Sequence, residues 1–266
     1  MRFDRKVGLV TGAASGIGRA VAIRFAQLGG RVAVADVNQA GAASVAATIK
    51  AAGGTAIAIT VDLAKPAEIV SMVNQTIDAF RRIDVLHNNA FGVPASLRRG
   101  RLARVTEIDQ EVWDYTLQLG LTAVMQTTRR VLPLMQKQGG GSIVNTASIS
   151  GLFGDYGIAA YNAMKAGVVN FTRVVAMEHA GDNIRCNCIC PGAVDTPLLQ
   201  HSLTAIPGFA DATLAAIPMG RLGTPEEMAN VVLFLASDLA SYVTGASFVA
   251  DGGLTAKTGI PTRFRN

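Results

Sequence analysis

The sequence predicts an α/β protein built on a doubly wound parallel sheet of about seven strands, with helices on both faces. Short β-branched, apolar runs alternate with longer segments of helical periodicity along the 266 residues. The runs are mainly apolar rather than alternating, as expected for strands covered on both faces. No linker rich in proline, serine or charge interrupts the alternation. One domain spanning residues 1–266 is therefore the simplest organisation.

The apolar runs define the strands in chain order. They are Val7–Thr11, Arg31–Asp36, Ala56–Val61, Val85–Asn88, Ser142–Thr146, Ile184–Cys190 and Ser247–Ala250. Parallel strands need crossover connections, and these are right-handed. The expected architecture is therefore Rossmann-like.

Helical spacing and end signals define the segments between the strands. Glycine pairs end the first two helices, Asn38 is placed to cap the second, and Pro66 stands in the first turn of the third. The predicted helices are Ile17–Leu28, Asn38–Ala52, Pro66–Phe80, Gln110–Lys137, Ala159–Ala180 and Glu226–Ala236. Residues Pro197–Ile217 form a mixed apolar segment that we interpret as a substrate lid.

Composition excludes several classes of protein. Half of the residues are hydrophobic and 16% are charged, the opposite of a disordered chain. No apolar stretch reaches the roughly 18 residues of a membrane span, and residues 1–6 do not open a secretory signal, so we expect a cytoplasmic protein.

The net charge of +5 is concentrated in Arg98, Arg99, Arg101 and Arg104. This segment is either a solvated loop or subunit contact, or it steers an anionic substrate; a nucleic-acid partner is not expected.

The three cysteines, Cys186, Cys188 and Cys190, alternate along one predicted strand. A thiol metal clip is one interpretation, but free cysteines are among the most buried residues, and we favour small hydrophobic side chains on a buried strand. The three histidines do not cluster in the sequence, and His87 is expected to be structural rather than catalytic. We predict no catalytic metal.

A glycine-rich turn joins the first strand to the first helix. Gly12, Gly16 and Gly18, with Ser15 and Ile17 between them, follow the pattern G-x-x-x-G-x-G. Such a turn lets backbone N–H groups and the helix dipole bind a pyrophosphate. Asp36 ends the second strand, where a carboxylate accepts hydrogen bonds from an adenosine ribose and repels a 2′-phosphate. These residues favour NAD over NADP; the alternative is that Asp36 caps a helix.

Tyr161 and Lys165 are spaced to share one face of a helix. A phenol is a weak base at neutral pH, but a neighbouring ammonium favours the phenolate. Ser148 follows the fifth predicted strand, at the carboxyl edge where ligands bind in such sheets. The alternative for Ser148 is a turn residue that hydrogen-bonds its own backbone.

These motifs, together with Asn88-Asn89-Ala90 and Pro191-Gly192, resemble the classical short-chain dehydrogenase/reductase family from Lys6 to about Ala256. The resemblance implies that Tyr161 is the general acid/base, that Ser148 hydrogen-bonds the substrate oxygen, and that Lys165 binds the nicotinamide ribose. It also implies a homotetramer with interfaces on the helices Gln110–Lys137 and Ala159–Ala180. Further cofactor contacts implied by the resemblance are Asp62, Leu63, Asn88, Asn89, Ala90, Pro191, Gly192, Val194 and Thr196.

The sequence departs from the family pattern at two positions. Gly120 stands where the family has a catalytic Asn in the central helix, and Gln118 is a poor substitute because it faces elsewhere. A water filling the space, a slower enzyme, and a cofactor-binding protein without catalysis are the three interpretations. Phe91 stands where the family often has glycine, and either narrows the nicotinamide pocket or packs against its wall.

The predicted reaction is NAD-dependent hydride transfer between nicotinamide and a secondary alcohol or ketone. The apolar lid favours a hydrophobic or alicyclic substrate. Substrate-contact candidates from the loops and lid are Phe91, Ser150, Phe153, Tyr156 and Leu198. The alternative is a non-catalytic or weakly active NAD-binding protein, because of Gly120.

Overall fold

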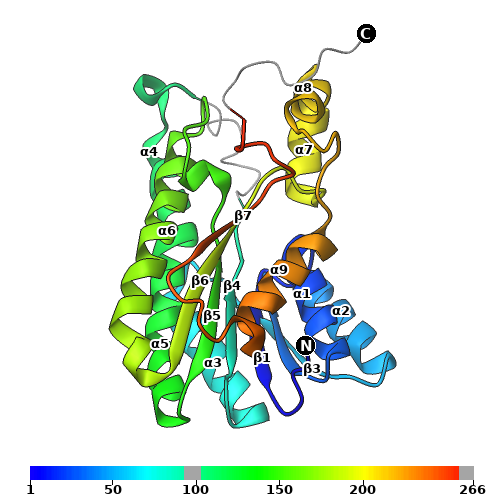
Figure 1. The fold of residues 1–266 in the computed structure, drawn as a ribbon, viewed down its shortest axis with the longest axis vertical. Helices are drawn as coiled ribbons and strands as arrows, with labels where there is room; N and C mark the ends of the chain where they lie inside the picture. The colour runs from blue at the N-terminus through cyan, green and yellow to red at the C-terminus, as the bar shows by residue number, and fades with distance from the viewer. Residues whose placement is uncertain (93–102, 258–266) are drawn as a thin grey trace.

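A computed structural model describes residues 1–92 and 103–257 of the chain. Its seven strands form one parallel sheet in the order β3-β2-β1-β4-β5-β6-β7 (Figure 1). The strands are β1 (Val7–Thr11), β2 (Arg31–Asp36), β3 (Thr55–Thr60), β4 (Val85–Asn88), β5 (Gly141–Thr146), β6 (Ile184–Pro191) and β7 (Ser247–Ala250). The predicted Rossmann-like, doubly wound sheet is confirmed.

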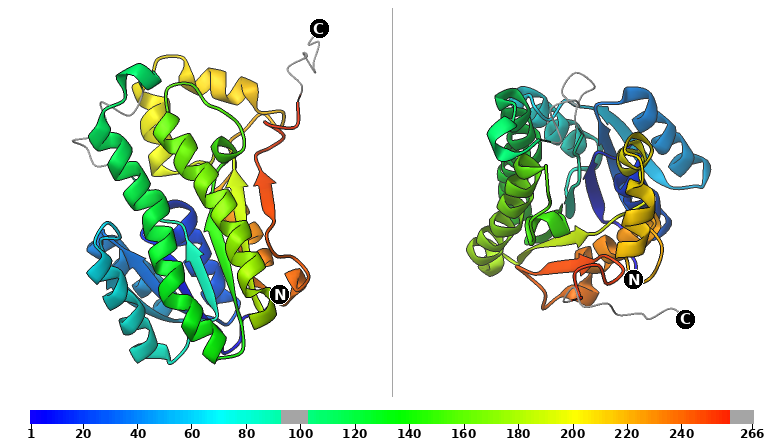
Figure 2. Two further views of the ribbon diagram at one scale, coloured as in Figure 1. Left: turned by 90° about the vertical axis from the view of Figure 1, so that its left-hand side faces the viewer. Right: turned by 90° about the horizontal axis from the view of Figure 1, so that it is seen from above.

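Helices cover both faces of the sheet and enclose two separate apolar cores (Figures 1 and 2). On one face lie α1 (Gly16–Gln27), α2 (Gln39–Ala51) and α9 (Pro225–Ala236). On the other lie α3 (Pro66–Phe80), α4 (Gln110–Leu117), α5 (Ala123–Lys137) and α6 (Ala159–His179). The strand order reverses between β1 and β4, and this places a ligand crevice at their carboxyl ends.

Local signals in the sequence set most of the element boundaries. The Asn38 side chain accepts a hydrogen bond from Gly41 N at 3.0 Å and caps α2. Pro66 occupies the first turn of α3. Cys186, Cys188 and Cys190 are free and buried on β6, as expected for small hydrophobic side chains in a strand.

The predicted long helix Gln110–Lys137 is interrupted. Between α4 and α5 the chain adopts one π-helical turn, η3 (Gln118–Thr122), with Gly120 buried at its centre. Single π turns within helices often mark functional sites, because the extra residue redirects the side chains around it. The α-helical periodicity of residues 110–137 carries no signal for this turn.

The segment predicted as a lid folds into α7 (Pro197–Ala205) and α8 (Phe209–Ala216), separated by Gly208 in a left-handed conformation. The two helices stand above the carboxyl edge of the sheet, on the side of α1 and α9 (Figure 1). Further short turns are η2 (Val105–Glu107), η4 (Ile149–Gly151), η5 (Ala180–Asp182) and η6 (Asp238–Ala240). That the α7–α8 segment closes over substrate stays a prediction.

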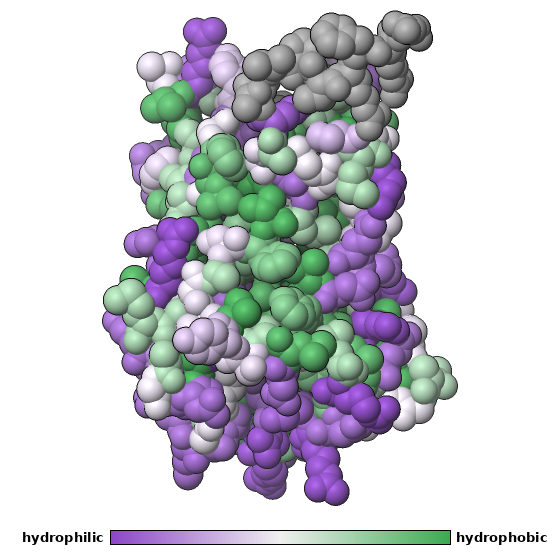
Figure 3. Space-filling model, in the orientation of Figure 1, coloured by the Kyte–Doolittle hydropathy of each residue, from purple (hydrophilic) through white to green (hydrophobic). Residues whose placement is uncertain are grey.

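Apolar side chains gather across the middle of the face that carries β7 (Figure 3). Phe248 and Val249 on this edge strand are 42% and 40% exposed, and Phe248 packs on the ring of Phe234 from α9. On α6, Val174 and Met177 are also exposed. Within the described ranges, no helix is both long and apolar enough to cross a membrane.

Candidate active site

The candidate site lies at the carboxyl ends of the central strands, beginning with the turn after β1. Gly12 and Gly16 have positive φ angles of 64° and 51°. A Cβ at Gly12 would lie 2.7 Å from Ala90 Cα, and a Cβ at Gly18 would overlap the carbonyl oxygen of Gly12. Only glycine permits this close packing and this conformation.

The amino end of α1 is open toward this turn. Ser15 is the N-cap residue and has an extended backbone, but its side chain makes no capping hydrogen bond. The first N–H groups of a helix need external partners and favour an anion. A Cβ on Gly16 would lie 3.2 Å from Thr196 Cγ2, so the cradle is bounded by the loop that follows β6. The glycines and the open helix end together fit a pyrophosphate.

Asn89 fastens the turn to β4. Its side-chain amide donates hydrogen bonds to the carbonyl oxygens of Thr11 at 3.1 Å and Gly12 at 3.2 Å. The neighbouring Asn88 is buried, and its amide donates to Asn145 Oδ1 and Thr128 Oγ1 inside the molecule. Asn89 therefore shapes the cradle, whereas the side chain of Asn88 joins β4 to β5 and α5.

Asp36 lies at the end of β2, next to the turn. Its two carboxylate oxygens accept hydrogen bonds from Ala14 N at 2.9 Å and Asn38 N at 2.8 Å. The cap of α2 is Asn38, so the alternative of Asp36 as the helix cap is wrong. Each carboxylate oxygen keeps a lone pair for a further donor. The group is thus fixed in place and able to accept from ribose hydroxyls.

The next strand end carries two more predicted cofactor contacts. Asp62 follows β3; its carboxylate accepts from Ala64 N at 3.0 Å and pairs with Lys65 at 3.5 Å. Leu63 beside it is buried in the core under α3 and α5. The side chain of Asp62 therefore mainly orders its own loop.

Lys165 is the most buried member of the predicted catalytic trio. Its ammonium donates a hydrogen bond to the carbonyl oxygen of Thr146 at 2.6 Å and lies 5.6 Å from the ring centroid of Tyr161, one helical turn away on α6. Burial lowers the pKa of Lys165 to about 8, since desolvation penalises the charged form. The predicted pairing of Tyr161 with Lys165 on one face of a helix is therefore present in the structure.

Ser148 begins the short helix η4 beside them. Its hydroxyl oxygen accepts from Ser150 N at 3.1 Å, so the turn role considered for this serine is real. Its hydroxyl also lies 3.2 Å from Ser150 Oγ. Gly151 brings η4 against α6, because a Cβ there would lie 2.7 Å from the Lys165 carbonyl group. The turn thus holds Ser148 close to the helix that carries Tyr161.

The loop after β6 forms the other wall. Gly192 packs on Asp251, and a Cβ there would lie 2.7 Å from the Asp251 Cβ. Val194 is buried and bridges to Gly223, while Thr196 caps α7 and reaches the cradle at Gly16. This loop, starting at Pro191, meets the glycine turn across the carboxyl edge, as the predicted cofactor contacts require.

The space beside Gly120 is filled by protein. A Cβ at Gly120 would lie 2.5–2.7 Å from Sδ, Cγ and Cε of Met164, a fully buried residue between Tyr161 and Lys165. Of the three interpretations of Gly120, the one in which a water fills this space does not fit the structure, because the Met164 side chain occupies it. Gln118 faces away, as expected, and donates to the carbonyl oxygen of Ala64. Sequence reasoning missed Met164, and Gly120 was the signal that could have found it.

Phe91 packs inside the site. Its ring lies 5.1 Å from the ring of Tyr161, at 59°, and 5.6 Å from the ammonium of Lys165. Phe91 also packs against Val112 of α4, as does Tyr115 of the same helix. Of the two interpretations of Phe91, packing against the wall is the one that these contacts support.

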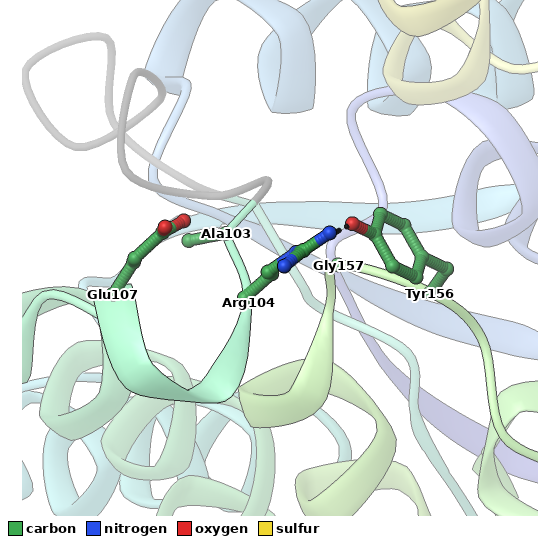
Figure 4. Close-up of a pocket in the computed structure, with 5 residues that line it drawn as sticks. All are labelled: Ala103, Arg104, Glu107, Tyr156 and Gly157. Carbon is green, nitrogen blue, oxygen red and sulfur yellow. Dashed lines mark hydrogen bonds between the residues drawn. The ribbon is translucent and has the colours of Figure 1, made fainter.

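The remaining predicted substrate contacts differ in exposure. Ser150 is buried, whereas Phe153, Leu198 and Tyr156 are exposed, Tyr156 to 81%. The Tyr156 hydroxyl accepts a hydrogen bond from Arg104 Nε at 3.1 Å across a shallow hollow (Figure 4). The hollow is lined by Ala103, Arg104, Glu107, Tyr156 and Gly157. Arg98, Arg99 and Arg101 of the predicted basic loop lie outside the described residues.

His87 extends the site's polar network. It is fully buried on β4, and its Nε2 lies 2.9 Å from Thr146 Oγ1, which lies 3.3 Å from Asn89 Oδ1. Burial lowers the pKa of His87 to about 3, so the ring is neutral at ordinary pH. The expected structural histidine thus connects the strand that receives Lys165 to the residue that braces the glycine turn.

Comparisons with known proteins place these features in a family. A family model described as "Enoyl-(Acyl carrier protein) reductase" matches residues 12–255. The chain belongs to the short-chain dehydrogenase/reductase family. Members of this family are oxidoreductases that use nicotinamide cofactors.

Relatives match over almost their whole length. The chain is 40% identical to a 3-oxoacyl-[acyl-carrier-protein] reductase of Thermotoga maritima, over 96% of this chain and 99% of that protein. It is 39% identical to a cyclohexanol dehydrogenase of Acinetobacter sp., over 96% and 97% of the two chains. The crystal structure of levodione reductase superposes with a TM-score of 0.89 at 34% identity, covering 96% of this chain and 99% of that one.

Proposed function

We propose that this short-chain dehydrogenase/reductase is an NAD-dependent dehydrogenase of secondary alcohols, also able to reduce the matching ketones. The observation that carries the proposal is the placement of Tyr161 beside the buried ammonium of Lys165, with Ser148 held against the same helix. The names of relatives, which include a cyclohexanol dehydrogenase and a meso-2,3-butanediol dehydrogenase of Serratia marcescens, support an alcohol or ketone as substrate.

Each member of the trio has a separate task. In alcohol oxidation, the Tyr161 phenolate takes the hydroxyl proton as the carbon–hydrogen bond breaks and its electron pair leaves as hydride. Ser148 donates a hydrogen bond to the substrate oxygen, where charge develops. Lys165 stabilises the phenolate by its charge and binds the ribose next to the nicotinamide. The bound nicotinamide supplies the hydride acceptor, so the products are ketone, reduced cofactor and a proton.

The residues of the carboxyl edge fit such a cofactor. Gly12, Gly16 and Gly18, with Ser15 and Ile17, would hold the pyrophosphate at the open end of α1. The carboxylate of Asp36 would accept from the adenosine ribose, and no basic residue stands at positions 37 or 38 to pair with a 2′-phosphate. This arrangement supports NAD over NADP. The loop from Pro191 to Thr196 would contact the nicotinamide.

The apolar segment α7–α8 supports a hydrophobic or alicyclic substrate. Leu198, Phe209 and Leu214 on it are exposed apolar side chains above the carboxyl edge.

We further propose a homotetramer, supported by the exposed apolar residues Val174 and Met177 on α6. Light scattering after size exclusion tests the assembly: a mass near four chains of 27.7 kDa is expected, and a monomer contradicts it.

A panel of cyclic and acyclic secondary alcohols, each with NAD and with NADP, tests the function by absorbance at 340 nm. We expect turnover with NAD, larger for cyclic alcohols than for polyols, and its loss in Tyr161→Phe. Stronger activity with NADP contradicts the role given to Asp36. Absence of turnover over the whole panel, with NADH binding intact, supports the alternative of a cofactor-binding protein without catalysis. The observation that favours this alternative is that Gly120, at the position of the family's Asn, supplies no side chain and packs against the apolar Met164.

A further inference from the structure

Phe91 contacts both residues of the catalytic pair. It follows Ala90 after β4, and its ring lies 5.1 Å from the Tyr161 ring and 5.6 Å from the Lys165 ammonium. The Tyr161 ring lies 5.6 Å from the same ammonium. The three groups therefore form a closed triangle in which each touches the other two.

Lys165 is a buried cation with few polar neighbours. Only 4% of the residue is exposed, and none of the ion pairs within residues 1–92 and 103–257 includes it. The ammonium donates a hydrogen bond to the carbonyl oxygen of Thr146. A desolvated ammonium needs compensation, and the face of an aromatic ring within about 6 Å supplies it. Phe91 and Tyr161 provide two such faces.

Among the described residues, few other titratable groups surround the ammonium. Tyr161 lies on its own helix, the thiols of Cys188 and Cys190 act on it from β6, and Tyr115 of α4 packs, like Phe91, against Val112. The carbonyl oxygen of Thr146 on β5 is neutral. In the described part of the chain, the charge of Lys165 thus depends chiefly on how well the carbonyl and the two rings replace water.

We propose that Phe91 is a positioning residue for the reaction: its ring excludes water from the Lys165 ammonium, offsets part of that loss with its π face, and packs on Tyr161, and so holds the cation beside the phenol. This role rests on the proposed function, but its physical basis concerns the free protein. Val112 of α4 also packs against Phe91, so a helix outside the catalytic pair helps to set the position of the ring.

Three substitutions separate the contributions of the ring. Phe91→Leu keeps the site dry and removes the π face, so it lowers the pKa of Lys165 further. Phe91→Ala admits water to the ammonium, so it raises that pKa toward the ordinary value near 10.4. Phe91→Tyr keeps the face and leaves the pKa near that of the parent. A residue that only fills space would not give opposite shifts in Leu and Ala.

The direct test is an NMR titration of protein labelled at lysine ¹³Cε, without cofactor, with the Lys165 signal assigned by its loss in Lys165→Met. We expect the Lys165 pKa to fall by about 0.5–1 unit in Phe91→Leu, corresponding to the usual strength of a cation–π contact. Circular dichroism checks that each variant is folded. Equal Lys165 titrations in the parent and in a folded Phe91→Leu protein overturn the proposal.

Kinetics give a second readout. The kinetic test uses an alcohol that the parent enzyme oxidises. Phe91→Leu is expected to lower kcat several-fold and to shift the acidic limb of the kcat–pH profile to higher pH, because the Tyr161 phenolate loses part of the stabilisation that the Lys165 cation gives it. Phe91→Tyr is expected to restore both. If only the KM for alcohol changes, while the acidic limb and the Lys165 pKa stay the same, the proposal is overturned and Phe91 is instead part of the wall of the substrate pocket. If no alcohol reacts, the proposed function is contradicted instead. The Lys165 titration, which needs no turnover, still tests the role of Phe91.

Discussion

The two halves of the site are built differently. Around the glycine turn, backbone groups would bind the proposed cofactor, and glycine conformation, Asn89 and Asp36 fix them in place. Around Tyr161 and Lys165, apolar side chains define the space: Phe91 covers the ammonium and Met164 fills the room above Gly120. Backbone sites need particular residues in sequence order, whereas packed sites depend on side chains brought together from distant elements. The first kind is therefore readable from a motif and the second is not.

The largest effect is expected at the packed half. Tyr161→Phe removes the proton acceptor and keeps the ring, so kcat should fall by about 10²–10⁴-fold. Because the glycine half is untouched, the Kd for NADH, measured by fluorescence, should change little. A variant that keeps most of its turnover contradicts the role of Tyr161, and one that also loses NADH binding contradicts the separation of the two halves.

Asp36→Ala tests the backbone half. Removing a fixed carboxylate that accepts from the ribose costs one or two charge-assisted hydrogen bonds, so the KM for NAD should rise about 10–100-fold. The preference for NAD over NADP should shrink, since no carboxylate then repels a 2′-phosphate. Initial rates with both cofactors give the measurement. Asp78→Ala, an exposed acid on α3, is the matched control, and equal effects of the two substitutions refute the assignment.

The same contrast explains how far sequence reasoning reached. Strand positions, the cap at Asn38 and the glycine turn follow from local periodicity and backbone needs, and the structure has them where predicted. The π turn at Gly120 did not follow, because this glycine packs against Met164, which is 44 positions along the chain and outside any local pattern. The burial of Asn88 and the link from His87 to Thr146 were hidden for the same reason. The same residue type can face a ligand site or the core, depending on which distant residues fold against it, as the neighbours Asn88 and Asn89 show.

The Gly120–Met164 contact predicts a size-dependent coupling. Gly120→Ala places a methyl group within 2.7 Å of the buried Met164 side chain, and overpacking of this kind costs about 1–3 kcal/mol of unfolding free energy. In a Met164→Ala background the same change should cost nothing or stabilise, because alanine favours helix over glycine. Urea unfolding of the four proteins gives the coupling. Gly154→Ala, with open space around it, is the control; additive effects of Gly120→Ala and Met164→Ala rule out the contact.

The smallest effect concerns His87, which connects the two halves through Thr146. Burial holds its pKa at about 3, below the value near 6.5 that it has in the unfolded chain. Between pH 6.5 and pH 3, His87 is protonated in the unfolded chain but neutral in the native protein. The free energy of unfolding therefore decreases as the pH falls below 6.5. One histidine then costs about 1 kcal/mol between pH 7 and pH 5.5.

His87→Val should remove this part of the pH dependence, whatever it does to stability at pH 7. Urea unfolding of parent and variant at pH 7, 6 and 5.5 gives the slopes, and His201→Val, at an exposed position of α7, is the control that should keep the parental slope. Equal slopes in His87→Val and the parent mean that the native ring accepts a proton. That outcome would make Thr146 and Asn89 neighbours of a charge, and the polar link between the two halves would then respond to pH rather than stay fixed.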